Sequence, residues 1–263
     1  MEHQAKKKFG QNFLTDTNLL KKIVDSANIK DKNVLEIGPG LGALTQFLTV
    51  QSKKYLAYEI DLSLVDTLKK FESEKAQFIF KDFMEDDVTK TLLNYFQNEE
   101  VHLVGNLPYY ITTPIIFEFL KYDHLKTATI MVQKEVGDRI ISDRNLKTYN
   151  GFSAILQYYT KVSRVVNVNR KMFNPVPKVD SMVVKLEKID RRLPKEQEIL
   201  YEKIVKSAFM HKRKTMVNNL SETFNIPKIE LQQFLNKLGF KETARAEELS
   251  VEDFILITKS FNY

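Results

Sequence analysis

The residues Asn106, Leu107, Pro108 and Tyr109 carry the strongest chemical signal in the sequence. An amine on an aromatic ring is a poor nucleophile because its lone pair is delocalised into the ring. Acceptors such as the Asn106 side-chain oxygen and the Leu107 carbonyl would drive that nitrogen towards tetrahedral geometry, and Pro108 would stiffen the loop. Tyr109 offers a face on which an extruded base can stack. The motif predicts methyl transfer to a nucleobase amine; the alternative is a proline turn after a strand.

A glycine-rich turn lies upstream, at Gly38, Gly40 and Gly42, with Pro39 inside it. Glycine lets the backbone approach a ligand closely because no Cβ intervenes. The dinucleotide fingerprint is G-x-G-x-x-G, whereas the spacing here is G-x-G-x-G, which argues against a pyrophosphate cradle. The same geometry suits a nucleoside with an amino-acid tail, the chemistry of S-adenosylmethionine. For the glycines alone, an ordinary tight turn is the alternative.

Two carboxylates follow at the ends of the next two expected strands. Glu59 comes about 20 residues after the glycine turn, where a carboxylate can accept hydrogen bonds from both hydroxyls of a ribose. Asp82 is positioned to accept from an adenine amine, and Phe83 beside it would pack against the ring. Taken singly, each carboxylate has an ordinary surface or loop explanation. Open α/β sheets bind ligands at the carboxyl ends of their strands. Because the glycine turn, Glu59 and Asp82 come at the ends of three successive expected strands, they predict one cofactor site.

The elements that must position these residues alternate between short apolar runs and longer helical patterns. The expected strands cover residues 33–38, 54–59, 77–80, 101–105 and 127–133, and the helices between them cover residues 41–50, 62–71, 88–96 and 114–122. This alternation predicts a parallel sheet covered by helices on both faces. A helix over 152–159 precedes two further strands, 161–168 and 179–189, whose connection is too short for a helical crossover. We expect these two strands to be antiparallel neighbours in a mainly parallel, seven-stranded sheet.

The pattern changes after residue 190. A charge cluster with Pro194 separates the sheet-forming part from a segment in which every candidate element is a helix, namely residues 196–210, 213–224, 228–238 and 251–261. The sequence therefore predicts an α/β protein of two domains. Residues 1–190 would form an N-terminal arm and a Rossmann-like domain of the S-adenosylmethionine-dependent methyltransferase type, and residues 191–263 would form a small all-α domain.

The charge distribution of the chain suits a polyanionic partner. The net charge is +6, and residues 144–179 and 203–214 contain Lys and Arg but neither Asp nor Glu. Such runs are usually solvated surface, but two of them in one chain favour contacts with phosphates.

The absence of cysteine excludes disulfides, thiolate zinc sites and cysteine nucleophiles. We find neither a secretory signal nor a membrane-spanning stretch, and we expect a cytoplasmic protein without a metal.

Six stretches of the sequence carry a resemblance to a known family. They are FGQNFL (residues 9–14), LEIGPGLG (35–42), GNLPY (105–109), FNPVPKVDS (173–181), KRKT with NNL (212–215 and 218–220), and RAEELS (245–250). Together they resemble the ribosomal RNA adenine dimethyltransferase family of the kasugamycin-sensitivity type, across essentially the whole chain. The resemblance implies S-adenosylmethionine as cofactor. It also implies dimethylation of two adjacent adenines near the 3′ end of 16S ribosomal RNA in the 30S subunit.

The resemblance also implies residue roles. Asn12 and Leu14 would close over the cofactor, and Phe173 would contact the target adenine from the face opposite Tyr109, with core packing as the alternative for Phe173. The C-terminal domain would assist docking to the ribosome. The complete predicted site comprises Asn106, Leu107, Pro108, Tyr109 and Phe173 for catalysis, Asn12, Leu14, Gly38, Gly40, Glu59, Ile60, Asp82, Phe83 and Asn106 for the cofactor, and Lys212, Arg213 and Lys214 for RNA. We expect a monomer.

The sequence departs from the family at two positions and leaves other functions open. The family often has Asn and Ser where this chain has Tyr110 and Thr112, and the bulkier Tyr110 would alter base entry or addition of the second methyl. A methylase of large-subunit ribosomal RNA, of the macrolide-resistance type, shares the same loop, but residues 212–220 and 245–250 favour the small-subunit type. The intact glycine turn, Glu59 and Asn106 argue against a non-catalytic RNA-binding assembly factor. A nicotinamide oxidoreductase fails on the glycine spacing.

Overall fold

The computed structural model of the chain describes residue 6 and residues 11–262. It divides into two compact units. The first comprises the residues up to Gly137 together with Val162–Lys188, and the second comprises Asp138–Lys161 together with Ile189–Tyr263. Two residues of the first motif, Phe9 and Gly10, lie outside the described residues.

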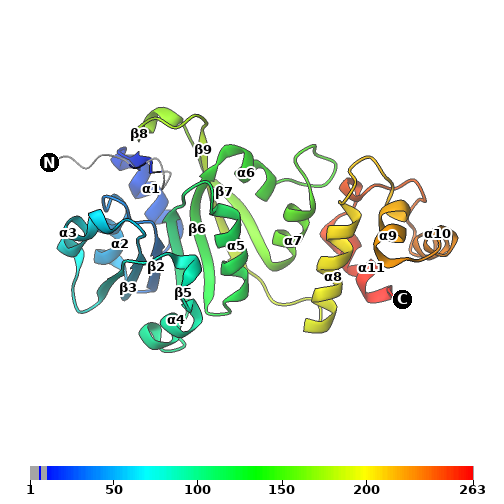
Figure 1. The fold of residues 1–263 in the computed structure, drawn as a ribbon, viewed down its shortest axis with the longest axis horizontal. Coiled ribbons are helices and arrows are strands. Elements are labelled where there is room, and N and C mark those ends of the chain that lie inside the picture. Colours follow the sequence, from blue (N-terminus) through cyan, green and yellow to red (C-terminus); the bar gives the residue numbers. More distant parts are fainter. Residues whose placement is uncertain (1–5, 7–10, 263) are drawn as a thin grey trace. The chain divides into compact units, whose positions relative to one another are not determined.

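The first unit is built on a sheet that has seven strands within the described residues, in the order β4-β3-β2-β5-β6-β9-β7 (Figure 1). Neighbours from β4 to β6 pair in parallel, whereas β9 pairs antiparallel with β6 and has β7 on its other side. The predicted mixed, mainly parallel sheet is confirmed. The strands are β2 (Asn33–Ile37), β3 (Lys54–Tyr58), β4 (Ala76–Ile79), β5 (Val101–Asn106), β6 (Leu125–Gln133), β7 (Thr160–Val168) and β9 (Ser181–Lys188).

Helical segments follow the parallel strands, as the alternation predicts. They are α2 (Thr45–Gln51), α3 (Val65–Leu68), α4 (Val88–Phe96), α5 (Thr112–Lys121) and α6 (Lys134–Ile140). Helix α4 has the predicted bounds. Helix α2 begins later than residue 41 because turn structure after the glycines continues to residue 44. The helix expected over residues 62–71 is interrupted, since α3 is flanked by the 3-10 turns Leu62–Leu64 and Lys69–Phe71.

Helix α1 (Thr17–Ala27) is absent from our sequence prediction although its sequence carries a signal. Its buried residues Leu19, Leu20, Ile23, Val24 and Ala27 recur with helical spacing. The side chain of Asp16 caps the first turn by accepting a hydrogen bond from the backbone N–H of Leu19, at 2.8 Å. An N-cap before an amphipathic stripe was therefore available to predict this helix.

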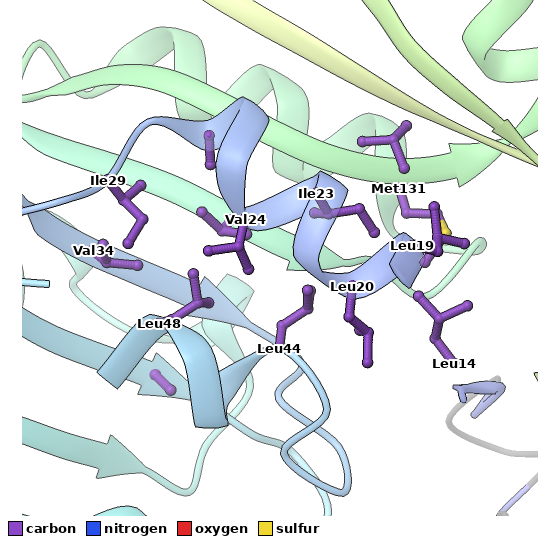
Figure 2. Close-up of a cluster of buried hydrophobic side chains, with 14 of the residues drawn as sticks. Leu14, Leu19, Leu20, Ile23, Val24, Ile29, Val34, Leu44, Leu48 and Met131 are labelled. Atoms are coloured by element: carbon purple, nitrogen blue, oxygen red, sulfur yellow. The ribbon is translucent and has the colours of Figure 1, made fainter. Parts of the chain in front are cut away.

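The core of the first unit lies between α1, α2 and one face of the sheet (Figure 2). Leu48 from α2 and Leu44 from the turn just before it meet Val34 from β2 there. Leu35 in β2 and Leu103 in β5 are each adjacent in sequence to a residue of this cluster, Val34 and Val104. Both leucines are equally buried but lie outside the cluster. Because successive strand residues point to opposite faces, both faces of the sheet are covered.

A second, two-stranded sheet joins segments that are far apart in the sequence. Strand β1 (Phe13–Leu14) pairs antiparallel with β8 (Phe173–Asn174), and Leu14 lies opposite Phe173. The backbone N–H of Thr15 extends the contact by donating to the carbonyl of Met172, at 3.3 Å. Figure 1 shows β8 beside the amino-terminal part of the described chain. This pairing brings the segment before β9 to the edge of the predicted active site.

The second unit is helical. It contains α7 (Gly151–Tyr159), α8 (Lys195–Ala208), α9 (Met216–Phe224), α10 (Lys228–Lys237) and α11 (Val251–Ser260). Helix α8 contacts α7, α9 and α11, and the rings of Tyr158 and Tyr201 lie with their centroids 4.3 Å apart. The predicted boundary at residue 190 places the α7 segment in the first domain, whereas the structure groups this segment with the helices that follow residue 189. A domain boundary at residue 190 stays a prediction.

Candidate active site

A cavity of about 1010 Å³, including its open mouth, lies at the carboxyl edge of the parallel strands of the first unit. Parallel strands end at the same edge of a sheet, so the segments that follow β2, β3, β4 and β5 form one wall. The predicted residues that line the cavity are Asn12, Leu14, Gly38, Gly40, Glu59, Ile60, Asp82, Phe83, Asn106, Leu107, Pro108 and Tyr109. The structure therefore brings together the expected cofactor residues and residues 106–109, which we call the catalytic corner.

The turn after β2 has a positive φ at each of its glycines, including Gly42 with φ of 85°. Gly38 and Gly40 adopt left-handed backbone angles, with φ of 71° and 59°, which side chains disfavour. The N–H of Gly38 donates to the carbonyl of Tyr58 at 2.9 Å, which joins the turn to the end of β3. A Cβ on Gly40 would lie 3.1 Å from the ring of Phe13. The turn thus presents backbone to the cavity, with β1 packed against it.

Glu59 directly follows β3 and is only 5% exposed. One carboxylate oxygen accepts the N–H of Gly40 at 3.0 Å, and the other accepts the N–H of Asp61 at 2.9 Å. Burial raises the pKa of Glu59, while these backbone N–H groups act in the opposite direction. The two bonds orient the carboxylate and leave it lone pairs for further donors, as recognition of ribose hydroxyls requires.

Glu36 is a cavity residue that the sequence reasoning missed. It lies in β2, is 1% exposed, and accepts hydrogen bonds from the hydroxyls of Tyr55 and of Thr45, the latter at 2.8 Å. Burial raises the pKa of Glu36 to about 7 although both hydrogen bonds lower it. A lone acidic residue inside an apolar strand was the available signal, because a buried carboxyl needs partners.

Asp82 and Phe83 follow β4 and form the far side of the expected cofactor site. The Asp82 side chain accepts the N–H of Met84 at 2.8 Å, which fixes its rotamer at the start of a short 3-10 turn. The ring of Phe83 is buried and meets the ring of Tyr58 edge to face, with centroids 5.3 Å apart. Packing therefore holds the aromatic wall in place.

The catalytic corner is held by contacts from several segments. The Asn106 amide nitrogen donates to the carbonyl of Asn12 at 3.1 Å, so the amide oxygen remains as the acceptor for a ligand. The carbonyl of Pro108 accepts the N–H of Ile111 and the hydroxyl of Thr112, each at 3.1 Å. Thr112, one of the departures from the family, is therefore a buried support of the loop.

Two tyrosines follow Pro108 and differ in exposure. Tyr109 is half-buried, and its hydroxyl lies 2.8 Å from the hydroxyl of Ser181, the first residue of β9. Burial raises the pKa of the Tyr109 phenol. Tyr110 also lines the cavity but is 57% exposed, so its ring stands at the mouth. Ser181 was quoted within a motif without a role, and nothing in the local sequence links it to Tyr109.

Phe173 is the predicted catalytic residue that the structure does not bring to the cavity. It is 3% exposed and packs in the core cluster with Leu14, its partner across the β1–β8 pair. It is absent from the cavity wall. The packing alternative therefore describes its position here. Contact of Phe173 with a base stays a prediction that requires the side chain to leave the core.

Lys212, Arg213 and Lys214 belong to the second unit, in the turn between α8 and α9, and all three are exposed. Residues 203–214 contain no acidic residue, but the fold brings an acidic side chain from a neighbouring helix to them. Glu222 on α9 lies 2.7 Å from the Lys214 amine and 3.4 Å from His211, and Lys214 holds the pKa of Glu222 below its usual value. Part of the positive charge is thus offset locally.

Neither a membrane span nor a metal cluster is found in the described part of the chain. None of its helices is long and apolar enough to cross a membrane. Its His, Asp and Glu side chains form no group of three or more that could hold a metal ion.

The sequence matches a family model over almost its full length. The model for ribosomal RNA adenine dimethylase matches residues 2–263. The ribosomal RNA small subunit methyltransferase A of Aster yellows witches'-broom phytoplasma is 46% identical to this chain, over 98% of this chain and 96% of that protein. The protein of the same name from Streptococcus equi subsp. zooepidemicus is 42% identical, over 95% and 89%.

Solved structures share the whole fold. A dimethyladenosine transferase from Plasmodium falciparum is similar with a TM-score of 0.78 and 27% identity, covering 94% of this chain and 98% of that one. The 23S rRNA methyltransferase ErmE has a TM-score of 0.76 at 24% identity, covering 96% of this chain and 100% of that one, and it supports the fold alone. With a matching sequence along nearly its whole length, the chain belongs to the ribosomal RNA adenine dimethylase family.

Proposed function

We propose that this protein transfers methyl groups from S-adenosylmethionine to the N6 amines of two adjacent adenines near the 3′ end of 16S ribosomal RNA, in the 30S subunit. One observation carries the proposal: a single cavity is lined by both the glycine turn with Glu59 and the catalytic corner. The relatives named ribosomal RNA small subunit methyltransferase A support a small-subunit substrate. Such a substrate would put the protein in the cytoplasm, where we expect it to act as a monomer.

The cavity residues fit S-adenosylmethionine. Glu59 would accept the ribose hydroxyls, because its carboxylate is already oriented by two backbone N–H groups. Asp82 would accept the adenine amine beside the Phe83 ring, and the bare backbone at Gly38 would admit the amino-acid tail. The bound cofactor would supply an electrophilic methyl group on a sulfonium centre.

The catalytic corner would bind the target base through its amine. The Asn106 side-chain oxygen and the Leu107 carbonyl would each accept one N–H, which localises the nitrogen lone pair, and the Tyr109 ring would stack on the base. Methyl transfer would leave a positive charge on this nitrogen, which makes its N–H strongly acidic, so the proton would pass to water without a strong base. An adenine amine has two N–H groups before the first transfer and one before the second, so a single acceptor suffices in the second round.

Mass spectrometry of adenine modification tests the proposal. Unmethylated 30S particles are incubated with the protein and S-adenosylmethionine, with the Asn106→Ala variant as the negative control. The expected product is dimethyladenine at two adjacent positions near the 3′ end of 16S RNA. Methylation of naked large-subunit RNA alone would identify the macrolide-resistance type instead. Binding to 30S without any methyl transfer would identify a non-catalytic assembly factor.

A further inference from the structure

The stretch of residues 173–181 is joined to the active site at both of its ends, although Phe173 does not line the cavity. At one end β8 pairs with β1, and the carbonyl of the neighbouring Asn12 accepts the Asn106 amide. At the other end the Ser181 hydroxyl lies 2.8 Å from the Tyr109 hydroxyl. The link between this motif and the catalytic corner therefore does not require the Phe173 side chain to enter the cavity.

Ser181 is a rigid anchor. Its exposed fraction is 0%, and it is the first residue of β9, where it lies opposite Gln133 of β6. The carbonyl of the preceding Asp180 accepts the N–H of Lys134 at 2.9 Å, which closes the start of the strand. A hydroxyl on a buried strand of a sheet has little freedom to move, so its position is set by the fold rather than by the loop it contacts.

The hydrogen bond between Ser181 and Tyr109 holds the hydroxyl end of the Tyr109 ring, which lies farthest from the backbone. The backbone side of the ring is held because Tyr109 follows Pro108, whose carbonyl accepts the Ile111 N–H and the Thr112 hydroxyl. Without a second contact the ring would still swing about its side-chain bonds. The bond to Ser181 holds the phenol oxygen, so both ends of the ring are held.

We propose that Ser181 is a positioning residue whose hydroxyl holds the Tyr109 ring in the orientation that receives the target base. The inference rests on the proposed function. Ser181 does not line the cavity, so it acts through Tyr109 and touches neither base nor cofactor. A misplaced stacking face misaligns the amine with the methyl donor, and errors of about 1 Å can cost roughly 100-fold in rate. The contacts of Glu59 and Gly40 are separate, so cofactor affinity is unaffected.

A double-mutant cycle on Tyr109→Phe and Ser181→Ala tests this inference. Each variant keeps the stacking ring and removes one partner of the hydrogen bond. The rate of a single turnover is measured on unmethylated 30S particles at saturating S-adenosylmethionine, together with the Kd for S-adenosylhomocysteine. Ser52→Ala is the matched control, because Ser52 is a buried serine of the same unit whose hydroxyl has no partner among the described residues.

We expect each single variant to lose about 10- to 100-fold in rate with an unchanged Kd, and the double variant to be no slower than either one. Multiplying losses in the double variant, or a wild-type rate for Ser181→Ala, would overturn the inference. If Ser181→Ala does not fold, a wild-type rate for Tyr109→Phe overturns it. Failure of the wild-type protein to transfer methyl groups would instead refute the proposed function, so the two failures are distinguishable.

Discussion

The cavity of the first unit and the basic loop of residues 211–214 in the second unit are built in opposite ways. In the cavity two buried or half-buried polar side chains are held by defined atoms: Glu59 by two backbone N–H groups, and Asn106 by the Asn12 carbonyl. In the loop, Lys212 and Arg213 are exposed, and Lys214 shares Glu222 with a histidine. Buried groups act through the positions of their atoms, whereas exposed charges act through their number. The cavity should therefore reject isosteric changes that the loop tolerates.

The strongest test of the comparison is Asn106→Ala. Loss of a preorganised acceptor should lower kcat by about 100- to 1000-fold, while the affinity for S-adenosylhomocysteine falls much less, because the other predicted cofactor contacts, such as Glu59 and Asp82, remain in place. Single-turnover rates and calorimetric titration measure the two effects. Asn94→Ala, the same change on the exposed face of α4, is the control. A near-normal kcat for Asn106→Ala would refute the role of this amide.

The next effect is on stability and comes from the buried Glu36. Its pKa rises from 4.5 in the unfolded chain to about 7 in the native state, so the native state binds the proton more tightly. The contribution of Glu36 to the free energy of unfolding is therefore complete below about pH 4.5. It is lost as the pH rises through 7, by on the order of 3 kcal/mol. Glu36→Gln removes this contribution to the pH dependence.

Urea unfolding of both proteins between pH 5 and pH 8 measures the difference in pH dependence due to Glu36. The exposed Glu74→Gln is the control and should keep the wild-type slope. Equal slopes for wild type and Glu36→Gln would show that the carboxyl of Glu36 does not titrate in this range.

Glu59→Gln should weaken cofactor binding by about 10- to 100-fold, the range for hydrogen bonds to a charged group. The amide nitrogen of glutamine would face the N–H of Gly40 or of Asp61, so one backbone bond is lost whichever way the amide turns. Because burial raises the pKa of Glu59, wild-type affinity for S-adenosylhomocysteine should fall as the pH is lowered. The Gln variant should lack that dependence on pH. If wild type and Glu59→Gln bound S-adenosylhomocysteine with equal affinity at every pH, Glu59 would not be a cofactor contact.

The smallest effect is expected in the basic loop. Reversing the charge with Lys212→Glu and Arg213→Glu should weaken binding to 30S particles and lower the slope of log affinity against log salt by about 1 to 2. Exchanging the two cations, Lys212→Arg with Arg213→Lys, should leave both quantities unchanged. Lys214→Gln should matter less than Lys212→Gln, since Glu222 already offsets the charge of Lys214. An unchanged salt slope after reversal would mean that these charges only solvate the surface.

Much of the cofactor half of the site could be predicted from the sequence. Glu59, Asp82 and Asn106 each come at the end of an apolar strand in a β-α alternation, and the positive φ of Gly38 and Gly40 agrees with the G-x-G spacing. These features depend on short-range sterics and on hydrophobic periodicity. The family match confirms the resemblance that the motifs suggested.

The sequence by itself thus determined the parallel β-α alternation, the edge of the sheet at which the cavity lies, and the residues Glu59, Asp82 and Asn106 that line it. Only the tertiary structure decided that Phe173 enters the core, that Ser181 reaches Tyr109, and that Glu222 meets Lys214. In each of these contacts, the local sequence around one residue does not predict which residue it will meet. Their geometry depends on how complete elements pack, and the register that sets Leu14 opposite Phe173 is one such outcome.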